Sequence, residues 1–371
     1  MKKILLLCAA LCMGLTGCVS GASSTVSEPR AGVAEETSEL SAVADTSAGQ
    51  QDAAQTRLFA MDTYMELRAY GAGADSALSE ISSMLTRLDH LLSVTEENSE
   101  VFAINHSDGQ AVLVSEQTYT LIQRALALSE TLGRALDVTI YPISRAWGFT
   151  TGDYQIPTQA RLQALLPWVD DTKLRLRDSE RSVQLPPNAE LDLGAVAKGY
   201  AGDRAAQMLK ERGIRSALLS LGSSTIRTVG LKPDGGKWRI AIRDPQDSDA
   251  FAGVVTMGEG AMDTSAGYER YFVGADGETY WHILDPQSGR PAKSGLISVT
   301  VLSETAFEGD GLSTALFVMG AEQAVRFWRE TGDFEFILIT EDGSILISEG
   351  AAEVFSPLGA YETAELTVVT P

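Results

Sequence analysis

The segment from Asp192 to Asp203 combines side chains and backbone that suit a phosphate-containing ligand. It holds an acid, closely spaced glycines and Lys198, at the point where an apolar strand is predicted to turn into a helix. Glycine lets a ligand approach the backbone closely, the first helical turn offers free N–H groups, and the lysine adds positive charge. Gly194 and Lys198 do not fit the Walker A pattern. The alternative is a solvent-facing lysine on an amphipathic helix, and this segment alone does not decide between the two.

A second group of reactive residues surrounds His282. Thr264-Ser265 and Tyr268-Glu269-Arg270 precede it, and the turn Asp285-Pro286 follows it. A histidine at the end of a strand can accept a proton near neutral pH. A turn-stabilising side chain is the alternative interpretation.

The other two histidines are predicted to be structural. His90 lies in a predicted helix and His106 in a predicted loop. Neither position has neighbouring motifs of the kind that surround His282.

A third pair, Asp310 and Thr314, lies four residues apart on a predicted helix and therefore shares one face of it. A carboxylate and a hydroxyl are hard oxygen ligands of the kind that Mg²⁺ accepts together with water and phosphate oxygens. Taken alone, Asp310 could equally cap the helix or face solvent.

In this order along the chain, the motifs resemble those of the ApbE-type FAD:protein FMN transferases. The resemblance rests on Asp192-Leu193-Gly194-Ala195-Val196-Ala197-Lys198-Gly199, on Thr264-Ser265 with Tyr268-Glu269-Arg270, on His282-Ile283-Leu284-Asp285-Pro286 with Gly289 and Pro291, and on Asp310 with Thr314-Ala315-Leu316. It covers the chain from about Leu58 to the C-terminal hairpin.

The resemblance implies a T-fold-like α+β body, with mainly antiparallel sheets, packed helices and an FAD cleft between halves. It implies an enzyme that uses Mg²⁺ to move FMN from FAD onto a threonine or serine hydroxyl of an exported flavoprotein, releasing AMP. FAD is then a substrate. The implied FAD contacts are Met61, Ala135, Leu136, Asp137, Asp192, Lys198 and His282; the implied metal ligands are the Ala195 carbonyl, Asp310 and Thr314; and the implied catalytic residues are His282, as a base, and Lys198.

The chain departs from the family pattern at three places. Gly222-Ser223-Ser224-Thr225 stands where a Gly-Gly-Asn/Asp turn is common, and Ser265-Ala266-Gly267-Tyr268 stands where Ser-Gly-Asp-Tyr is common. Val94-Thr95 replaces an aromatic residue expected near the flavin. The departures fall on the isoalloxazine and acceptor sides and leave the pyrophosphate and metal motifs unchanged.

The N-terminus predicts an exported lipoprotein. Lys2 and Lys3 precede the apolar run 4–15, and Leu15-Thr16-Gly17-Cys18 resembles a bacterial lipobox. We expect residues 1–18 to be a signal peptide that ends at a lipidated Cys18, which would anchor the protein on the exported side of a bacterial membrane. An uncleaved membrane anchor is the alternative, but the apolar run is short for a span of about 20 residues.

Composition predicts how the mature chain is organised. All three cysteines lie within residues 1–18, and the last of them, Cys18, is the predicted lipid attachment site. The mature fold would therefore have no disulfide or thiolate site. Residues 19–55 are rich in Ser, Ala, Glu and Thr, which predicts a flexible tether, and residues 56–371 form the predicted transferase domain. Within the tether, Ser20-Gly21-Ala22-Ser23 resembles the Ser/Thr-Gly-Ala-Thr core of family acceptor sites, although tether composition explains it equally.

Charge and hydrophobic periodicity bound the fold and the partners. A net charge of −21 argues against binding to nucleic acid. Strands and helices are mixed without strict β-α-β alternation, which favours an α+β fold over a doubly wound sheet. Helices are predicted at residues 74–92, from Ser115, at 158–166, 196–211, 308–319 and 321–330.

The sequence leaves two other functions open. An FAD pyrophosphatase would release FMN and AMP, with water in place of the acceptor hydroxyl. A non-catalytic lipoprotein would bind FAD without any chemistry. The joint presence of Lys198, His282, Asp310 and Thr314 favours chemistry over binding alone.

Overall fold

The computed structural model describes residues 31–32 and 53–371. The predicted signal peptide, Cys18 and the Ser20-Gly21-Ala22-Ser23 motif lie outside these residues, as does most of the predicted tether. Within the described part of the chain, no helix is both long enough and apolar enough to cross a membrane.

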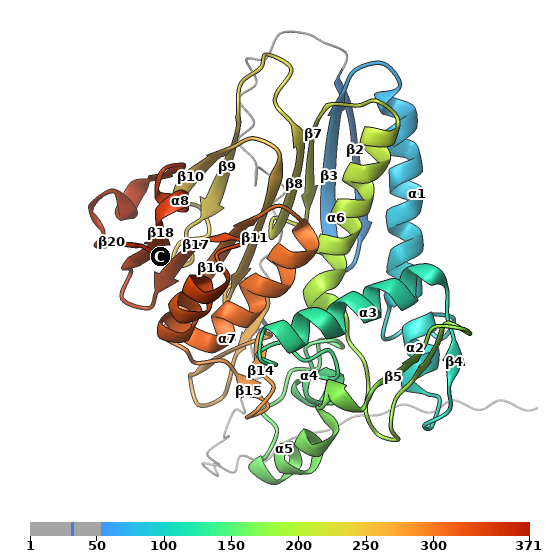
Figure 1. The fold of residues 1–371 in the computed structure, drawn as a ribbon. Coiled ribbons are helices and arrows are strands. Elements are labelled where there is room, and N and C mark those ends of the chain that lie inside the picture. The colour runs from blue at the N-terminus through green and yellow to red at the C-terminus, as the bar shows by residue number, and fades with distance from the viewer. Residues whose placement is uncertain (1–30, 33–52) are drawn as a thin grey trace, which may run out of the picture.

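A nine-stranded sheet forms the centre of the molecule (Figure 1). All its neighbouring strands are antiparallel except the last pair, β18 and β20, which is parallel. In spatial order the strands are β2 (Ala53–Ala60), β3 (Thr63–Tyr70), β7 (Ser216–Leu221), β8 (Thr225–Gly230), β11 (Gly260–Ala266), β16 (Leu296–Ser303), β17 (Glu335–Thr340), β18 (Ile345–Ser348) and β20 (Leu366–Val369).

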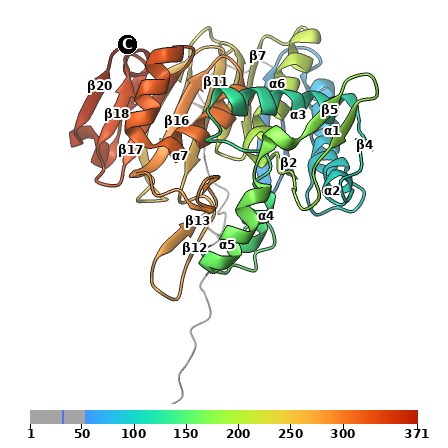
Figure 2. The same ribbon diagram turned by 60° about the horizontal axis from the view of Figure 1, so that its bottom comes forward.

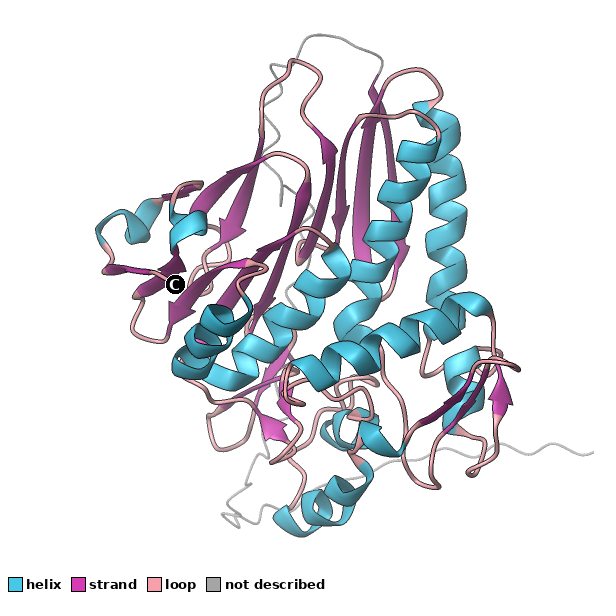
Figure 3. Cartoon of the chain, in the orientation of Figure 1, coloured by secondary structure: helices cyan, strands magenta, loops and turns pink. Residues whose placement is uncertain are grey.

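The two faces of this sheet are covered differently (Figure 3). Helices α1 (Ala74–Leu92), α6 (Gly194–Glu211) and α7 (Ala306–Thr331) pack on one face, and a small sheet of β9 (Trp238–Arg243), β10 (Phe251–Met257) and β19 (Phe355–Pro357) covers part of the other. Because both faces of the sheet are covered, successive side chains of strand β17 are buried on alternate faces. Phe336 and Leu338 join the helix-side core, whereas Ile337 and Ile339 join the core under the small sheet.

Local signals account for the ends of several helices. Ser115, Thr158 and Thr305 each accept a hydrogen bond from a backbone N–H of the first turn, as N-caps do. The first of these caps begins α3 (Glu116–Thr131) and the second α5 (Gln159–Leu165). The prediction of one helix over residues 74–92 is confirmed by α1, whose apolar stripe is buried. Helix α7 joins the two predicted C-terminal helices across a kink at Gly320 (φ 77°, ψ 168°).

A smaller lobe lies below the helices and carries an aromatic core (Figure 2). It contains α4 (Tyr141–Trp147), α5 and the hairpin of β12 (Tyr271–Val273) and β13 (Thr279–Trp281). Phe272 is buried there, within 6.4 Å of Trp147 between ring centroids. Asp276-Gly277 lies in the turn of this hairpin, as an Asp-Gly pair favours.

The remaining elements are short. They are α2 (Glu100–Asn105), β4 (Val112–Leu113), β5 (Arg175–Arg177), β6 (Ser182–Gln184), β14 (Leu284–Asp285), β15 (Arg290–Pro291), α8 (Glu349–Ala352) and the two-residue strand β1 (Ala31–Gly32). Strand β1 falls inside the predicted tether, and β2 begins at Ala53, so residues 53–55 belong to the sheet rather than to the tether. The prediction of a mixed α+β fold with mainly antiparallel sheets is confirmed.

Candidate functional site

The crossing of α6 and α7 brings Lys198 next to Asp310. The Lys198 Nζ lies 3.6 Å from Asp310 Oδ1, and the Gly199 amide donates a hydrogen bond of 2.9 Å to Asp310 Oδ2. In a regular α-helix that amide would donate to the Ala195 carbonyl. Two residues predicted from separate motifs therefore meet, and Asp310 accepts from the amide that lies four residues after Ala195.

Gly199 is what permits this crossing. A Cβ at residue 199 would lie 2.1 Å from the Ala306 carbonyl oxygen of α7 and 2.8 Å from the Phe307 Cα. The sequence suggested that glycine admits a ligand to the backbone, whereas the structure shows Gly199 admitting the second helix. This close contact sets the distance between Lys198 and Asp310.

Asp203 fixes the start of α7 one turn further along α6. Its carboxylate accepts hydrogen bonds of 3.0 Å from the amides of Ala306 and Phe307, and it pairs with Arg227 at 3.0 Å. A carboxylate at a helix N-terminus accepts hydrogen bonds from free N–H groups and interacts favourably with the positive end of the helix dipole. Asp203, the last residue of the segment from Asp192 to Asp203, is thus a positioning residue for Asp310.

A second buried acid, Asp263, lies behind Asp310 on β11. Asp263 is fully buried, and within the described residues neither carboxylate oxygen has a hydrogen-bond partner of good geometry, although the Thr225 hydroxyl is near enough to oppose the rise in pKa described next. Burial raises the pKa of Asp263 well above its usual range, and the nearby charge of Asp310 raises it further. Burial also raises the pKa of Asp310, while Lys198 and the Gly199 amide lower it. Asp263 was not predicted; the available signal was a single charged residue in the stretch of small residues 260–266.

Three hydroxyl groups lie between β11 and α7. Ser265 Oγ is 2.9 Å from Ser313 Oγ and 3.1 Å from Thr314 Oγ1. Thr314 Oγ1 also donates to the Asp310 carbonyl at 3.4 Å. The Thr264-Ser265 motif and the Asp310/Thr314 pair therefore form one continuous polar wall.

His282 borders the same region from the end of β13. Its amide donates to the Arg270 carbonyl at 3.0 Å, and its Nδ1 lies 3.2 Å from the same oxygen. The Nδ1–H tautomer would donate to that carbonyl and leave Nε2 free as a proton acceptor. Burial, together with the positive charges of Arg270 and Lys198, lowers the pKa of His282 to about 3, against the opposing effect of the hydrogen bond to the Arg270 carbonyl. The imidazole is therefore neutral at physiological pH.

Glu269 is a further titratable residue of the site. Burial raises the pKa of Glu269 to about 7, against the opposing effects of Lys198 and Arg270, and Asp310 raises it as well. In the sequence, Glu269 is recognisable only as part of the Tyr268-Glu269-Arg270 motif. Its setting beside two cations became visible only in three dimensions.

Asp192 and the turn that contains Met61 both lie near Arg270. Asp192 Oδ1 accepts a hydrogen bond of 2.8 Å from the Gly194 amide, and burial raises the pKa of Asp192, with Arg270 and Lys198 opposing. Met61 occupies the turn between β2 and β3 with φ 52°, and its amide donates to Asp89 at 2.9 Å. Arg270 lies 3.8 Å from Asp62 of this turn, so the turn approaches the His282 side.

The Ala135-Leu136-Asp137 run is placed by its own internal bonds. Asp137 is buried; its Oδ1 accepts from the Thr139 amide at 2.8 Å and its Oδ2 accepts from the Asp171 amide at 3.2 Å. The Leu136 carbonyl accepts from Ser129 at 2.7 Å. These contacts give Asp137 a role in holding the loop, whereas its implied contact with FAD stays a prediction.

The run of residues 135–142 favours a buried strand or a turn. Residues 135–140 form a turn, whereas Tyr141 begins helix α4. Pro142 lies in the first turn of that helix, where its missing N–H is not needed.

The oxygen atoms near Asp310 fit a hard divalent cation. Asp310, Thr314 and the Ala195 carbonyl offer one charged and two neutral oxygens, which is the ligand chemistry that Mg²⁺ accepts when water and phosphate complete its shell. Within residues 31–32 and 53–371, no group of three or more His, Cys, Asp or Glu side chains is arranged to hold a metal.

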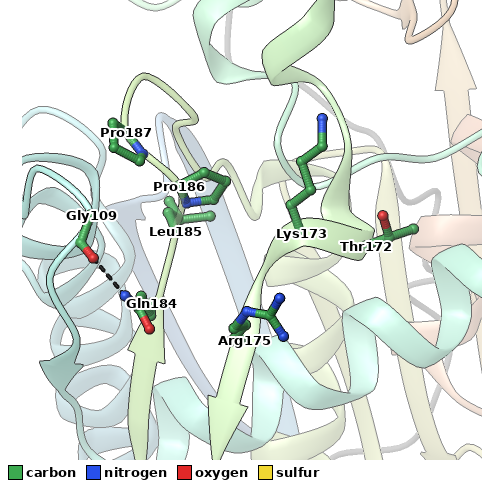
Figure 4. A pocket seen from close by; sticks show the side chains of 8 residues that line it. All are labelled: Gly109, Thr172, Lys173, Arg175, Gln184, Leu185, Pro186 and Pro187. Carbon is green, nitrogen blue, oxygen red and sulfur yellow. Dashed lines mark hydrogen bonds between the residues drawn. The ribbon is translucent and has the colours of Figure 1, made fainter.

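A cavity of about 320 Å³ lies elsewhere on the molecule (Figure 4). It is lined by Gly109, Thr172, Lys173, Arg175, Gln184, Leu185, Pro186 and Pro187. None of the predicted site residues lines it, so it is separate from the Lys198–Asp310 site.

The helix crossing gives a direct stability prediction. We expect Gly199→Ala to lower the free energy of unfolding by about 3 kcal/mol, because backbone atoms of α7 occupy the position of the new Cβ. Gly202→Ala on the same helix is the control: its Cβ would make ordinary contacts of 3.4 Å or more, so we expect a change of less than about 1 kcal/mol. Urea unfolding followed by circular dichroism measures both. Equal stability of the two variants would contradict the importance of the crossing.

Comparison with known proteins identifies the family. The ApbE family matches residues 61–338. An FAD:protein FMN transferase of Klebsiella pneumoniae is 35% identical over 298 residues, which span 79% of this chain and 92% of the relative. One of Vibrio cholerae is 33% identical over 292 residues, spanning 77% and 85%.

Solved structures agree with the sequence matches. The ApbE protein of Thermotoga maritima superimposes with a TM-score of 0.77 at 31% identity, covering 82% of this chain and 99% of that one. The flavin transferase ApbE of Vibrio cholerae gives a TM-score of 0.73 at 28% identity, covering 82% and 100%. The chain belongs to the ApbE family.

Proposed function

We propose that this chain is an FAD:protein FMN transferase, which moves FMN from FAD to a hydroxyl group of an acceptor protein and releases AMP. The acceptor residue is a threonine or serine. The observation that carries the proposal is the meeting of Lys198, Asp310 and His282 around one site, from motifs up to 112 residues apart (198 to 310). Its relatives at 30–35% identity are named for this activity.

The site supplies what transfer from a pyrophosphate requires. Negative charge must be neutralised and the attacking oxygen must be held in line, with little covalent help from the protein. Lys198 provides a cation, and its partial pairing with Asp310 at 3.6 Å leaves its remaining N–H donors for the FAD pyrophosphate. Asp192 and Met61 extend the proposed FAD-binding surface toward the β2–β3 turn.

We assign the metal position to Asp310, Thr314 and the Ala195 carbonyl. Bound Mg²⁺ would neutralise charge on the pyrophosphate oxygens. The Gly199 amide and the Lys198 ammonium hold the two carboxylate oxygens of Asp310, so the carboxylate needs little rearrangement to act as a ligand.

His282 is the proposed base. With Nδ1 directed at the Arg270 carbonyl, Nε2 can take the proton from the acceptor hydroxyl as the oxygen attacks the phosphorus of the FMN half. The bond between that phosphorus and the bridging oxygen breaks, and AMP leaves. The low pKa of His282 keeps the base unprotonated before the acceptor arrives.

The pH dependence should follow Glu269 rather than His282. Because the pKa of Glu269 is about 7, its deprotonation above neutral pH adds a negative charge beside Lys198 and should weaken binding of the FAD pyrophosphate. We expect kcat/KM for FAD to be level between about pH 5 and 6.5 and to fall above about pH 7. Glu269→Gln should remove the fall. A wild-type profile that instead declines on the acid side near the ordinary histidine pKa would contradict this assignment.

We propose that the protein acts outside the cytoplasm, anchored to a bacterial membrane through Cys18. The lipobox-like residues 15–18 support this location. The acceptor would then be an exported or membrane flavoprotein, such as a subunit of a redox complex.

One experiment separates the possible activities. The protein is incubated with FAD, Mg²⁺ and an exported flavoprotein domain carrying Ser-Gly-Ala-Thr, and the gel is examined for acid-stable flavin fluorescence. Labelled acceptor with stoichiometric AMP supports the transferase. Free FMN and AMP without label support the pyrophosphatase, and intact FAD would contradict both enzymatic functions.

A further inference from the structure

Strand β12 has an edge that a second polypeptide segment can extend. β12 lies between β13 and the two-residue strand β1 in a small antiparallel sheet. Ala31 is paired with Phe272, and Gly32 with Tyr271. These two residues come from the segment before the folded body, while the hairpin itself projects from the smaller lobe (Figure 2). The molecule thus already shows an extended segment added to this edge.

The hydrogen-bond pattern shows which groups face that edge. The Arg270 carbonyl accepts from His282, and the Gly274 amide donates to Glu278, so both face β13. Backbone groups alternate in direction along a strand, so Phe272 also faces β13, whereas Tyr271 and Val273 present their N–H and C=O groups to the opposite edge. Gly32 is therefore hydrogen-bonded to Tyr271, and Ala31 forms the non-hydrogen-bonded pair with Phe272.

This edge leads directly to the proposed base. A segment that pairs antiparallel with β12 in this register would meet Arg270 one residue beyond its Tyr271 partner, and Arg270 is bonded to His282 on its other side. Two strand spacings correspond to about 10 Å, so a segment that leaves the edge in this direction enters the vicinity of the imidazole within a few residues.

We propose that the acceptor protein docks by adding an extended segment antiparallel to β12, with its acceptor hydroxyl on the C-terminal side of that segment. In the absence of acceptor, residues 31–32 of the same chain occupy the edge and compete for it. Main-chain hydrogen bonds would provide affinity for an extended partner of varied sequence. This inference rests on the transfer to a protein hydroxyl proposed above and adds how the protein is held.

The edge itself is tested by removing one donor. Val273→Pro deletes an N–H that faces the edge, and proline is tolerated on edge strands, so the hairpin should persist. Val273→Thr keeps the donor and the β-branched shape and is the matched control. We expect Val273→Pro to raise KM for the acceptor domain about tenfold, with unchanged FAD affinity, and Val273→Thr to resemble wild type. Equal KM values in the two variants would overturn the docking site.

Competition by the chain's own segment is tested in the full-length protein. Gly32→Pro removes the donor that bonds to Tyr271, whereas Ala31→Pro removes one that points away from β12. We expect Gly32→Pro to lower KM for the acceptor about threefold or more, and Ala31→Pro to change it less. Identical effects of the two prolines would overturn self-occupancy.

The direction of docking is tested on the acceptor. Proline substitutions on the N-terminal side of its acceptor threonine should weaken labelling more than those on the C-terminal side, and the reverse would overturn the proposed polarity. Amide hydrogen exchange of Tyr271 and Val273 in the Gly32→Pro variant reports docking without turnover. Protection by the acceptor with no labelling would refute the transfer and keep the docking; labelling without protection would refute the docking alone.

Discussion

Asp310→Asn is expected to reduce Mg²⁺-dependent FMN transfer by about a thousandfold while leaving the fold intact. Asparagine has nearly the same shape, and its carbonyl oxygen can still accept from the Gly199 amide, which is 2.9 Å from Asp310 Oδ2. What is lost is the one negative charge among the proposed metal ligands. The measurement is AMP release and acceptor labelling over a Mg²⁺ titration, in which the half-saturating Mg²⁺ concentration should rise.

Glu308→Gln provides the control for this change. It also removes one acidic charge from α7, but the Glu308 side chain is exposed. Among the described residues, its one hydrogen-bond partner is the cap residue Thr305, whose hydroxyl lies 3.0 Å away. We expect its activity and Mg²⁺ dependence to match wild type. If Asp310→Asn retained full activity at low Mg²⁺, the metal would have to lie elsewhere, and Lys198 would have lost a partner without consequence.

The parts of the structure that the sequence predicted well depend on neighbouring residues. The apolar stripe of α1 repeats at helical spacing, so the helix over residues 74–92 was predicted correctly. The Asp342-Gly343 turn between β17 and β18 is likewise a short-range signal, in this case of a hairpin. Helix α4 was not predicted, because Ile140 and the β-branched residues before it favour a strand. Pro142, which lies in the first turn of α4, was the available signal for the start of a helix. Strand β11 was missed because its small and polar residues hide a position buried on both faces.

The site was only partly accessible to sequence reasoning for a different reason. The ligand-binding motifs could be found one by one, and the resemblance ordered them, but their contacts arise from the packing of α6 against α7. No local pattern indicates that Gly199 contacts Ala306, or that Asp263 lies close enough to Asp310 to affect its titration. Glu269 likewise acquires its pKa of about 7 from burial and from groups that are distant in sequence.

One departure from the family pattern can be described physically. Gly222 and Ser223 both adopt positive φ, 73° and 52°, in the turn between β7 and β8. Glycine adopts this conformation without strain, whereas serine does so at a cost of about 1–2 kcal/mol. The turn keeps its backbone shape although the second glycine of the common pattern is replaced.

His282→Gln is expected to lower the rate of FMN transfer by a factor of about 100 to 10,000, the range that a positioned general base contributes. Glutamine approximates the size of the ring and keeps polar atoms, but it cannot accept a proton at neutral pH. FAD binding should change little, because Lys198, Asp192 and the Asp310 region are untouched. The effect should therefore appear in kcat at saturating FAD and acceptor, measured by acid-stable flavin fluorescence.

His90→Gln supplies the matched control, because His90 is exposed. Among the described residues its one ion-pair partner is Glu96, at 2.7 Å. We expect wild-type transfer from this variant. The comparison also bears on the choice between transfer and hydrolysis. A stronger nucleophile at higher pH needs less help from a base, so the deficit of His282→Gln should shrink as pH rises if proton removal from the acceptor hydroxyl is its role. A deficit that is constant with pH, accompanied by weaker FAD binding, would instead make His282 part of the FAD-binding surface.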